Sequence, residues 1–413
     1  MSELRLAWRN VGRNPRRTAL TVAATVFAVL LVVDFTALTR GVHEKMIEDS
    51  VRLRSGHAML AAPGYLAERS LDHFLELDSA MIARLDAVPE VEGWAPRVVG
   101  FALVSQDVTS QGVALLGVDP RRESSVTSLP SRVVDGRFLS ADAERGAREI
   151  VLGKRLAERI GARVGDRVLV YGVAYTLESA YELFTVVGLA QLPDARLERT
   201  LAVVAMADLQ DFLAFGDRVS EVALLARSAD RTEPLRQALV SSLDGLVPAP
   251  MVHPWPEVMP DLEQILILDD AGLYIMLAIL VVVVGFGILN TILMAVLERQ
   301  RELGVMLALG LRPSAIFRVV FLESILLAGL GLVLGLGLAI PIGLWMEAHP
   351  IVMGEQLAGL SEFMGMEPVI TSNLAFSTVW KSALVILVVA TVASLYPALK
   401  AGRANPVDAL RSL

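Results

Sequence analysis

The most apolar part of the chain is a pair of long hydrophobic stretches, 271–297 and 318–345, separated by a short charged segment. Within the first, residues 273–296 hold no charged residue in 24 positions. A helix of this length spans about 36 Å, enough to cross a ~30 Å hydrocarbon core with some tilt. Because a helix of a soluble domain is rarely apolar on every side over this length, the pattern predicts two membrane-spanning helices.

Two further apolar stretches, 18–40 and 378–398, are also long enough to cross a membrane as helices. The first follows a basic segment, a pattern that is also typical of a cleaved signal peptide. Its apolar run is long and has no clean A-x-A cleavage site, which favours an uncleaved helix. The chain is therefore expected to have four transmembrane α-helices.

Between the first two of these stretches, residues 41–268 have the hydropathy of a soluble α/β domain. Short runs rich in β-forming residues alternate with turn residues, as in EIVLG (149–153) and DRVLVYGVA (166–174). Helical patterns fit about 70–88, 154–160, 208–215 and 231–243. The segment is longer than a typical single domain, which predicts two subdomains. The predicted fold class is a membrane protein with four transmembrane α-helices and a large α/β (α+β) domain inserted between helices 1 and 2.

Charged residues are segregated along the chain, although 54% of it is hydrophobic. Residues 1–17 hold five arginines, and the segment 297–318 holds four. The connection 346–377 holds four glutamates and neither lysine nor arginine. Since lysine and arginine in short loops remain on the cytoplasmic side, both termini and the 297–318 turn are predicted to face the cytoplasm. Residues 41–268 and 346–377 then face outward.

The sequence contains no recognisable catalytic or metal-binding constellation. There is no cysteine, and the five histidines form no i, i+3 or i, i+4 pair, so a zinc site is not expected. Gly153 and Lys154 lack the G-x-x-x-x-G-K-[ST] surroundings of a phosphate-binding loop. We predict no nucleotide site, no cofactor and no enzymatic activity in this chain.

Few polar groups interrupt the apolar stretches. Asp34 and Glu323 are candidates for functional intramembrane charges. The alternatives are a polar helix end for Asp34 and a structural hydrogen bond to a neighbouring helix for Glu323. So few charges do not form an ion relay, which argues against passage of polar cargo through the chain. Gly331 and Gly335 form a G-x-x-x-G ridge, a pattern typical of close helix packing.

The segment 298–317 begins with the charged sequence ERQRE and continues with apolar residues before Gly310. A short helix that carries charges and an apolar face is suited to docking in a groove on another protein. An ordinary solvated turn is the alternative.

This segment also carries a family resemblance. The sequence ILNTILMAVLERQRELGVMLALGLRPSAIFRVVFLESILL (288–327) resembles the signature of the FtsX-like, MacB-type (type VII) ABC transporter permeases. Leu303 and Leu311 stand where that family usually has isoleucine and alanine. Three more segments are similar to the family: LAWRNVGRNPRRTALT (6–21), IVLGKRLAERIGARVGDRVLV (150–170) and YPALKAGRANPVDALR (396–411). The GHAMLAAPGY element (56–65) and the chain length look most like its LolC/LolE lipoprotein-releasing branch.

The resemblance implies a mechanism and a set of partners. Such permeases pair on a cytoplasmic ABC ATPase dimer, which binds the ATP and magnesium, and they work by mechanotransmission. On this basis ATPase coupling is assigned to Glu298, Arg299, Arg301, Glu302, Gly304 and Gly310. The expected partners are the ATPase dimer, a second permease subunit (identical or different), a lipoprotein or other lipid-anchored substrate, and a periplasmic chaperone or adaptor, with no nucleic acid among them.

The implied location is the bacterial inner membrane. The predicted order is a cytoplasmic amphipathic segment (1–17), transmembrane helix 1 (18–40), a periplasmic domain (41–268), transmembrane helix 2 (271–297), a cytoplasmic coupling helix (298–317), transmembrane helix 3 (318–345), a short periplasmic loop (346–377), transmembrane helix 4 (378–398) and a cytoplasmic tail (399–413).

The leading hypothesis is a permease subunit that extracts lipoproteins from the outer leaflet of the inner membrane for delivery to the outer membrane. One alternative is a MacB-like permease of a tripartite efflux pump. The other is an FtsX-like regulator of cell-wall hydrolases that transports nothing.

Overall fold

The computed structural model describes residues 7, 9, 15–141, 145–228, 231–246, 249–352, 354 and 369–403. Most of the segment 1–17, residues 353 and 355–368 of the loop 346–377, and residues 404–413 of the expected tail lie outside the described residues. The chain divides into two compact units. We call them the helical unit (1–43, 266–352 and 369–413) and the mixed unit, whose main part is 44–265.

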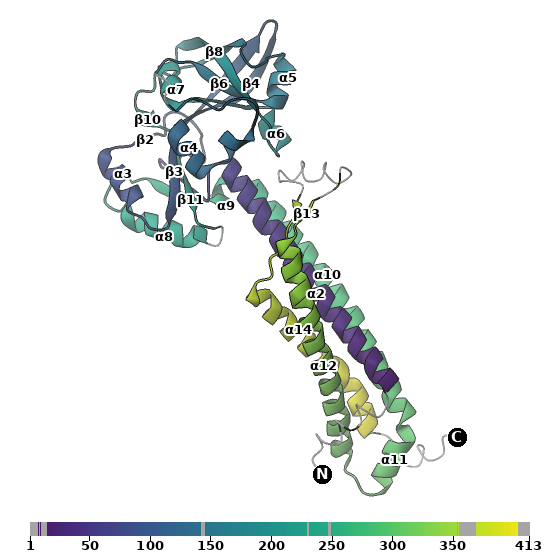
Figure 1. Cartoon of the computed structure of the whole chain (residues 1–413). Coiled ribbons are helices and arrows are strands. Elements are labelled where there is room, and N and C mark those ends of the chain that lie inside the picture. The colour runs from purple at the N-terminus through teal and green to yellow at the C-terminus, as the bar shows by residue number, and fades with distance from the viewer. Residues whose placement is uncertain are drawn as a thin grey trace. The chain divides into compact units, whose positions relative to one another are not determined.

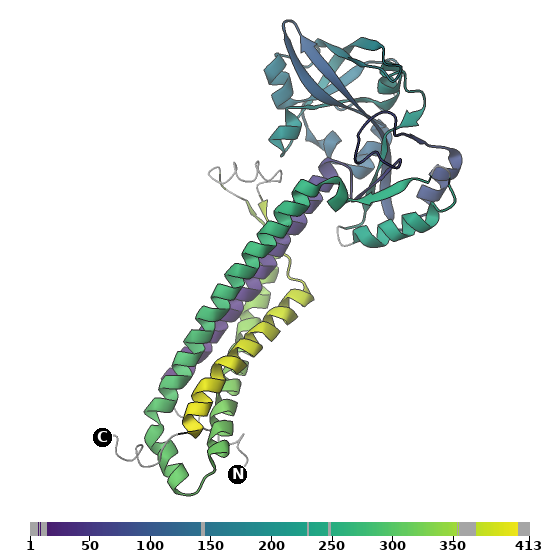
Figure 2. The same ribbon diagram turned by 180° about the vertical axis from the view of Figure 1, so that it is seen from behind.

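Four helices in the described residues are long and apolar enough to cross a membrane. They are α2 (Pro15–Leu53), α10 (Pro260–Glu298), α12 (Pro313–Ala348) and α14 (Phe376–Gly402). Within the helical unit they form one bundle, and the short helix α11 (Gln300–Ala308) joins α10 to α12 (Figures 1 and 2). Strands β13 (Ile351–Val352) and β14 (Val369–Ile370) pair antiparallel beyond the end of α12.

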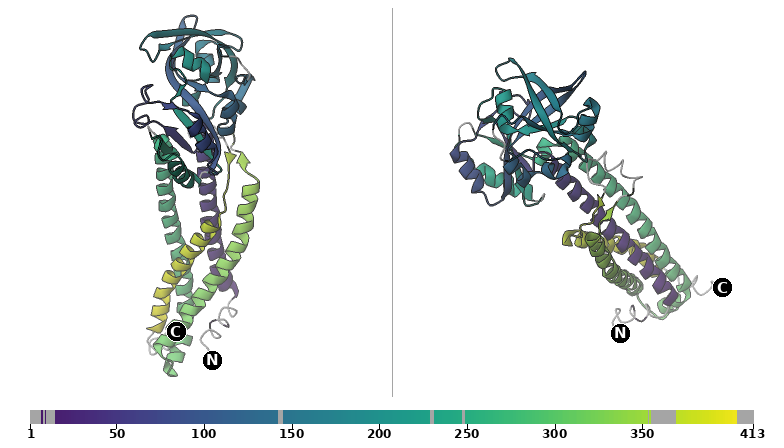
Figure 3. Two further views of the ribbon diagram at one scale, coloured as in Figure 1. Left: turned by 90° about the vertical axis from the view of Figure 1, so that its left-hand side faces the viewer. Right: turned by 45° about the horizontal axis from the view of Figure 1, so that its top comes forward.

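The bundle is held by apolar side chains on facing helices. Val29 and Val33 of α2, Ala339 of α12 and Ile386 of α14 are all buried in one cluster, and Leu277 of α10 packs against it. Helices α12 and α14 cross in the view of Figure 1 and lie side by side in the left view of Figure 3. Many apolar side chains on the outside of the bundle are exposed, as is expected for helices that face lipid.

Six strands of the mixed unit close into a barrel. In order around the ring they are β3 (Val91–Gln106), β4 (Thr109–Val118), β9 (Leu201–Ala205), β6 (Glu149–Gly153), β8 (Ser179–Ala190) and β7 (Arg167–Val173), which pairs again with β3. The β4–β9 and β6–β8 pairs are parallel and the others are antiparallel. Because side chains alternate between the two faces of a strand, Val168 and Val170 point into the barrel and are fully buried with Phe184.

The barrel shares strand β3 with a second core. The sheet continues from the first half of β3 through β11 (Glu221–Ala226) and β1 (Ala58–Ala61) to β12 (Met251–Pro254). Helices α3 (Ser79–Asp86) and α8 (Thr232–Ser242) cover this sheet with buried leucines, among them Leu85 and Leu235. The remaining elements of the unit are short: β2 (Leu75–Glu76), α4 (Pro120–Val126), η1 (Leu129–Arg132), β5 (Val133–Gly136), α5 (Lys154–Ile160), α6 (Ala195–Glu198), α7 (Met206–Phe212), β10 (Arg218–Val219) and α9 (Trp255–Val258).

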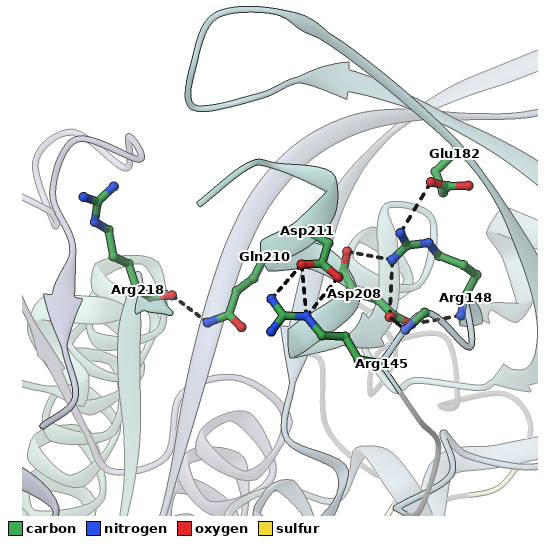
Figure 4. A network of polar contacts seen from close by, with 8 residues as sticks. Arg145, Arg148, Glu182, Asp208, Gln210, Asp211 and Arg218 are labelled. Atoms are coloured by element: carbon green, nitrogen blue, oxygen red, sulfur yellow. Dashed lines mark hydrogen bonds and ion pairs between the residues drawn. The ribbon is translucent and has the colours of Figure 1, made fainter. Parts of the chain in front are cut away.

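A polar network fixes the turn before β6 against helix α7. The Asp208 carboxylate, 1% exposed, accepts hydrogen bonds from the backbone N–H groups of Gly146 (2.6 Å) and Arg148 (2.9 Å) and from the Arg148 guanidinium (3.3 Å) (Figure 4). One turn further along α7, Asp211 forms an ion pair with Arg145 at 2.6 Å. The Asp208 bonds satisfy a buried carboxylate, which would otherwise be costly to desolvate.

Several expected elements agree with the structure and some do not. The strand at 149–153 and the helix at 154–160 are confirmed residue for residue. The helix expected at 70–88 is wrong in its first half, because Asp78 caps α3 by accepting a hydrogen bond from the Met81 N–H at 2.7 Å. Helix α2 also continues to Leu53, well beyond the expected boundary at 40.

The extension of α2 has a local cause. Lys45 bonds Asp49 at 2.5 Å, and Arg52 bonds Glu48, so two i, i+4 ion pairs stabilise the helix after the apolar stretch ends.

Candidate functional site at the α10–α12 connection

Helix α11 has an inner face that packs on the bundle. Leu303 is 4% exposed and lies in one cluster with Ile316 and Val320 of α12 and with Ala398 and Ala401 of α14. The side chains of Met306 and Leu307 pack against the same cluster. A displacement of α11 toward the bundle would therefore act directly on α12 and α14.

Arg299 lies at the junction of α10 and α11 and is turned inward. Its Nη1 lies 3.2 Å from Glu323 Oε2, and its Nε lies 3.2 Å from Glu302 Oε2. The Glu323 side chain is 7% exposed and the Arg299 side chain 20% exposed. The structure thus brings together three residues that the sequence analysis treated in two separate groups. Arg299 and Glu302 both take part in intramolecular ion pairs, and the Glu302 side chain remains 40% exposed.

The outer face of the connection carries a different set of side chains. Arg301, Val305 and Leu309 follow one another at i, i+4 and i+8, and so lie on one face of α11. All three are exposed, and Leu309 is 82% exposed. Leu311 and Arg312, which follow α11, are also exposed. We call Arg301, Val305, Leu309, Leu311 and Arg312 the exposed stripe.

The other assigned positions have distinct local roles. Glu298 is exposed at the end of α10, and Gly304 is buried on the inner face of α11. Gly310 has a φ of +91°. Its N–H donates to Leu307 O at 3.0 Å, and the N–H of Leu311 donates to Met306 O at 3.0 Å. This is a Schellman ending, in which glycine is preferred because it adopts the left-handed conformation without strain.

A cavity of about 580 Å³ lies beside the exposed stripe. Its lining includes Arg301 and Leu311 of the stripe and Met306 and Ile316 of the packed face. A mixed apolar and basic surface next to a hollow is a suitable contact for an acidic, partly apolar groove on another protein. Within the described residues, no three His, Asp or Glu side chains are grouped so that they could hold a metal ion.

The two glycines of the G-x-x-x-G ridge contact helix α2. A Cβ atom built at Gly331 would lie 2.5 Å from Thr25 Cβ, and one at Gly335 would lie 2.6 Å from Val29 Cβ. The neighbouring Gly329 and Gly337 of the same helix have no atom within 4 Å of such a Cβ. Only one of the two glycine rows therefore lies at a helix contact.

Asp34 of α2 and Glu323 of α12 lie far apart along the bundle. A Cβ at Gly343 would be 3.3 Å from Asp34 Oδ1, an atom that is buried and has no hydrogen-bond partner among the described residues. Gly343 and Glu323 are 20 residues apart in one helix, a separation of about 30 Å at 1.5 Å per residue. The two carboxylates therefore do not form a relay with each other.

The outer surface of the barrel carries an apolar patch that sequence reasoning missed. In the strand register, Leu103, Tyr171 and Tyr181 lie directly opposite one another on β3, β7 and β8 and are 43%, 43% and 73% exposed. Neighbouring rows add further exposed apolar side chains. The whole patch, which we call the barrel face, consists of Phe101, Leu103, Leu169, Tyr171, Val173, Tyr181 and Leu183.

A contiguous exposed apolar patch on a folded domain commonly marks an interaction site. A signal for the barrel face is present in RVLVYGV (167–173), where the outward positions of the strand after Arg167 are all apolar. The alternation expected of a strand with one solvated face is missing there.

Comparisons with known proteins agree with this architecture. A family model described as MacB-like periplasmic core domain matches residues 18–242, and one described as FtsX-like permease C-terminal matches residues 274–406. The lipoprotein-releasing system transmembrane protein LolC of Xylella fastidiosa is 26% identical over 400 residues, which cover 95% of this chain and 92% of that protein. LolE of Haemophilus influenzae is 24% identical over 424 residues, 98% of each chain. The macrolide export ATP-binding/permease protein MacB of Nitrobacter winogradskyi is 24% identical over 421 residues, which cover 98% of this chain and 59% of that protein.

Four apolar helices together with a MacB-like α/β domain define a multi-pass membrane permease of the bacterial inner membrane. The chain belongs to the FtsX-like, MacB-type family of ABC transporter permeases and is similar to LolC and LolE. The family indicated by the sequence motifs is thus confirmed.

Proposed function

We propose that this chain is the permease subunit of a transporter that extracts lipoproteins from the outer leaflet of the inner membrane and delivers them toward the outer membrane. The similarity to lipoprotein-releasing LolC and LolE proteins extends over nearly the whole chain and supports this choice. The arginine distribution favours an orientation with both termini and α11 in the cytoplasm and with the mixed unit in the periplasm.

The observation that carries the proposal is the two-sided character of α11. Its exposed stripe is free to contact a cytoplasmic ABC ATPase dimer, while its inner face is fixed to α12 by Leu303 and by the Arg299–Glu323 ion pair. A displacement of α11 produced by ATP-driven closure of the ATPase would therefore also displace α12. In this scheme two permease subunits stand on one ATPase dimer.

The membrane-spanning residues agree with force transmission rather than conduction. Asp34 of α2 lies beside Gly343, about 30 Å along α12 from Glu323, and Glu323 is bonded to Arg299. A cargo that remains anchored in the outer leaflet needs no polar pathway through the helices.

The barrel face is our candidate surface for a periplasmic chaperone or adaptor. Its in-register tyrosines and aliphatic side chains resemble the apolar, aromatic centre of protein interfaces. A Tyr181→Glu variant should lose capture of that partner from a periplasmic extract, whereas Val240→Glu, at an exposed position on α8, should retain it. Equal capture by the two variants would remove the barrel face from the proposal.

The first test of function is purification from native membranes in mild detergent, followed by mass spectrometry of the retained proteins. An ATPase retained together with acylated lipoproteins supports lipoprotein release. A retained periplasmic adaptor and outer-membrane channel would instead support efflux. That second candidate is favoured by the similarity to MacB across 98% of this chain. Retention of a cell-wall hydrolase without cargo would refute both.

The coupling role of the exposed stripe is tested with Arg301→Glu, in the reconstituted complex. Reversal of a charge at the centre of an interface is expected to weaken docking by about 2 kcal/mol or more, roughly a 30-fold change. Stimulation of the ATPase by the permease should fall accordingly. The matched control is Arg159→Glu, an exposed arginine on α5 of the mixed unit. If both variants stimulate the ATPase equally, the stripe is not the docking surface.

A further inference from the structure

A second cavity, of about 420 Å³, lies entirely within the mixed unit. It is lined by Leu53, the last residue of α2, and by Val258 and Met259, which directly precede α10. It thus lies where the chain of the mixed unit continues into the first and second membrane-spanning helices. Its volume is within the range of small-molecule sites, about 300–1,000 Å³.

One part of the cavity is apolar. Leu116, Leu197 and Leu201 contribute aliphatic surface together with Leu53 and Met259. These side chains suit the glycerol and first methylene groups of a lipid rather than a fully polar solute.

A second part is basic. Arg69 and Arg196 line the cavity and are exposed, and neither guanidinium forms a hydrogen bond or ion pair with another described residue. Arg54, also in the lining, is paired with Asp194 at 2.9 Å. Two uncommitted guanidinium groups in the lining of one cavity are suited to binding a phosphate, since arginine can bind phosphate oxygens with two parallel N–H groups.

The third part is a pair of buried oxygens that lack partners. Ser55 and Glu221 are 4% and 5% exposed and both line the cavity. Neither Ser55 Oγ nor Glu221 Oε2 has a hydrogen-bond partner among the described residues. The other carboxylate oxygen, Glu221 Oε1, is 3.9 Å from Arg97 Nη1.

The nearest cation therefore satisfies the buried Glu221 carboxylate only in part. Arg97 is committed mainly to Glu123, at 2.5 Å. The buried Tyr65 phenol interacts with Glu221 and can donate one hydrogen bond to it, so the carboxylate and the Ser55 hydroxyl keep acceptor positions that a donor in the cavity can use.

We propose that this cavity binds the phosphoethanolamine headgroup of a membrane phospholipid. The phosphate is bound by Arg69 and Arg196, the primary ammonium donates to Glu221 Oε2 and Ser55 Oγ, and the glycerol end lies against the leucines. An ammonium group supplies three N–H donors, which the quaternary nitrogen of a choline headgroup cannot supply. A glycerol headgroup carries no positive charge to match Glu221. The proposal is independent of the transported cargo and of the ATPase.

The test is native mass spectrometry of the full-length chain in detergent with added short-chain lipids. The probes are dihexanoyl phosphatidylethanolamine, phosphatidylcholine and phosphatidylglycerol, and free O-phosphoethanolamine. The ethanolamine lipid should bind most tightly. An Arg69→Gln, Arg196→Gln double variant should weaken its binding about tenfold or more, because two charge-assisted contacts are lost. Arg159 is an exposed arginine outside the cavity, so Arg159→Gln should leave binding of the ethanolamine lipid unchanged. This control accounts for lipid that binds elsewhere on the protein.

The inner wall is tested separately. Glu221→Gln should reduce the preference for phosphatidylethanolamine over phosphatidylglycerol. If Glu221→Gln does not fold, Ser55→Ala is measured instead and should have the same effect. Equal binding of the three lipids by the parent chain would overturn the proposal, as would cavity variants that bind like Arg159→Gln. Free O-phosphoethanolamine binding as tightly as the lipid would also overturn it, because the apolar wall would then contribute nothing. No ATPase is present in these measurements, so failure here leaves the transport proposal standing, and the reverse holds as well.

Discussion

The contact between helices α2 and α12 gives the sharpest prediction, because the same helix supplies its own control. A Cβ added at Gly335 would lie 2.6 Å from Val29 Cβ and 2.9 and 3.0 Å from its two γ carbons. Carbon atoms pack best at about 3.5–4.0 Å. Gly335→Ala therefore forces the two helices apart by roughly 1 Å or distorts them, and overpacking of this kind costs about 1–3 kcal/mol.

Gly337→Ala introduces the same methyl group two residues further along α12, where no atom lies within 4 Å. Both substitutions gain the same helix propensity, about 1 kcal/mol in favour of alanine. The difference between the two variants thus isolates the steric cost, and Gly335→Ala should be less stable than Gly337→Ala by about 1–3 kcal/mol. Gly331→Ala and Gly329→Ala form a second pair with the same expected order, because only Gly331 lies against Thr25.

The assay is reversible unfolding by sodium dodecyl sulfate in mixed micelles, followed through the fluorescence of Trp345 and Trp380 on α12 and α14. If Gly335→Ala and Gly337→Ala unfold at the same detergent fraction, α2 does not pack on this face of α12. The assignment of Gly331 and Gly335 to helix packing would then have to be abandoned.

Three further predictions concern single contacts. Asp208→Asn should lower the unfolding free energy by about 2–3 kcal/mol, because the buried carboxylate that accepts several hydrogen bonds loses its charge. Asp211→Asn, at the more exposed ion pair, should lower it by less than about 1 kcal/mol. Chemical denaturation of the two variants measures the difference. A hydrogen bond from Arg137 holds the pKa of Glu149 below its ordinary value, so the stability from this pair is present above the unfolded pKa of about 4.3 and is lost as the pH falls below it. Thermal unfolding from about pH 7 to about pH 3 should therefore show a shallower acid loss in Arg137→Gln than in the parent chain. Gly310→Ala should destabilise the end of α11 by about 1–2 kcal/mol, because residue 310 has a φ of +91°, which is strained for alanine. The added methyl group meets no atom within 4 Å, so the cost comes from the backbone alone. An unchanged unfolding curve would contradict the Schellman ending.

The elements that could be predicted from the sequence are those whose limits are set by local chemistry. Helix α5 ends where Gly161 adopts a φ of +77°, and the strand before it was a short apolar run. Helix α3 could have been placed correctly as well, since Asp78 is a favourable N-cap and its position predicts the helix start at 79. By contrast, closure of the barrel depends on pairing β3 with β7, across more than 60 residues of sequence, and no local pattern encodes that register.

The candidate site shows the same division. The sequence indicated that 298–317 contacts a partner, but it could not say which side of the helix is free, because that depends on what packs against the other side. Arg299 and Arg301 are equivalent by composition and spacing. Arg299 is turned inward by Glu323, a residue 24 positions later on α12, and only Arg301 remains exposed. A charge-reversal test that changes both arginines would therefore mix two effects, a like-charge contact with the largely buried Glu323 and loss of a docking contact. The single variant Arg301→Glu separates the two effects. It weakens the binding of a partner that contacts the exposed stripe, and it leaves the Arg299–Glu323 ion pair in place.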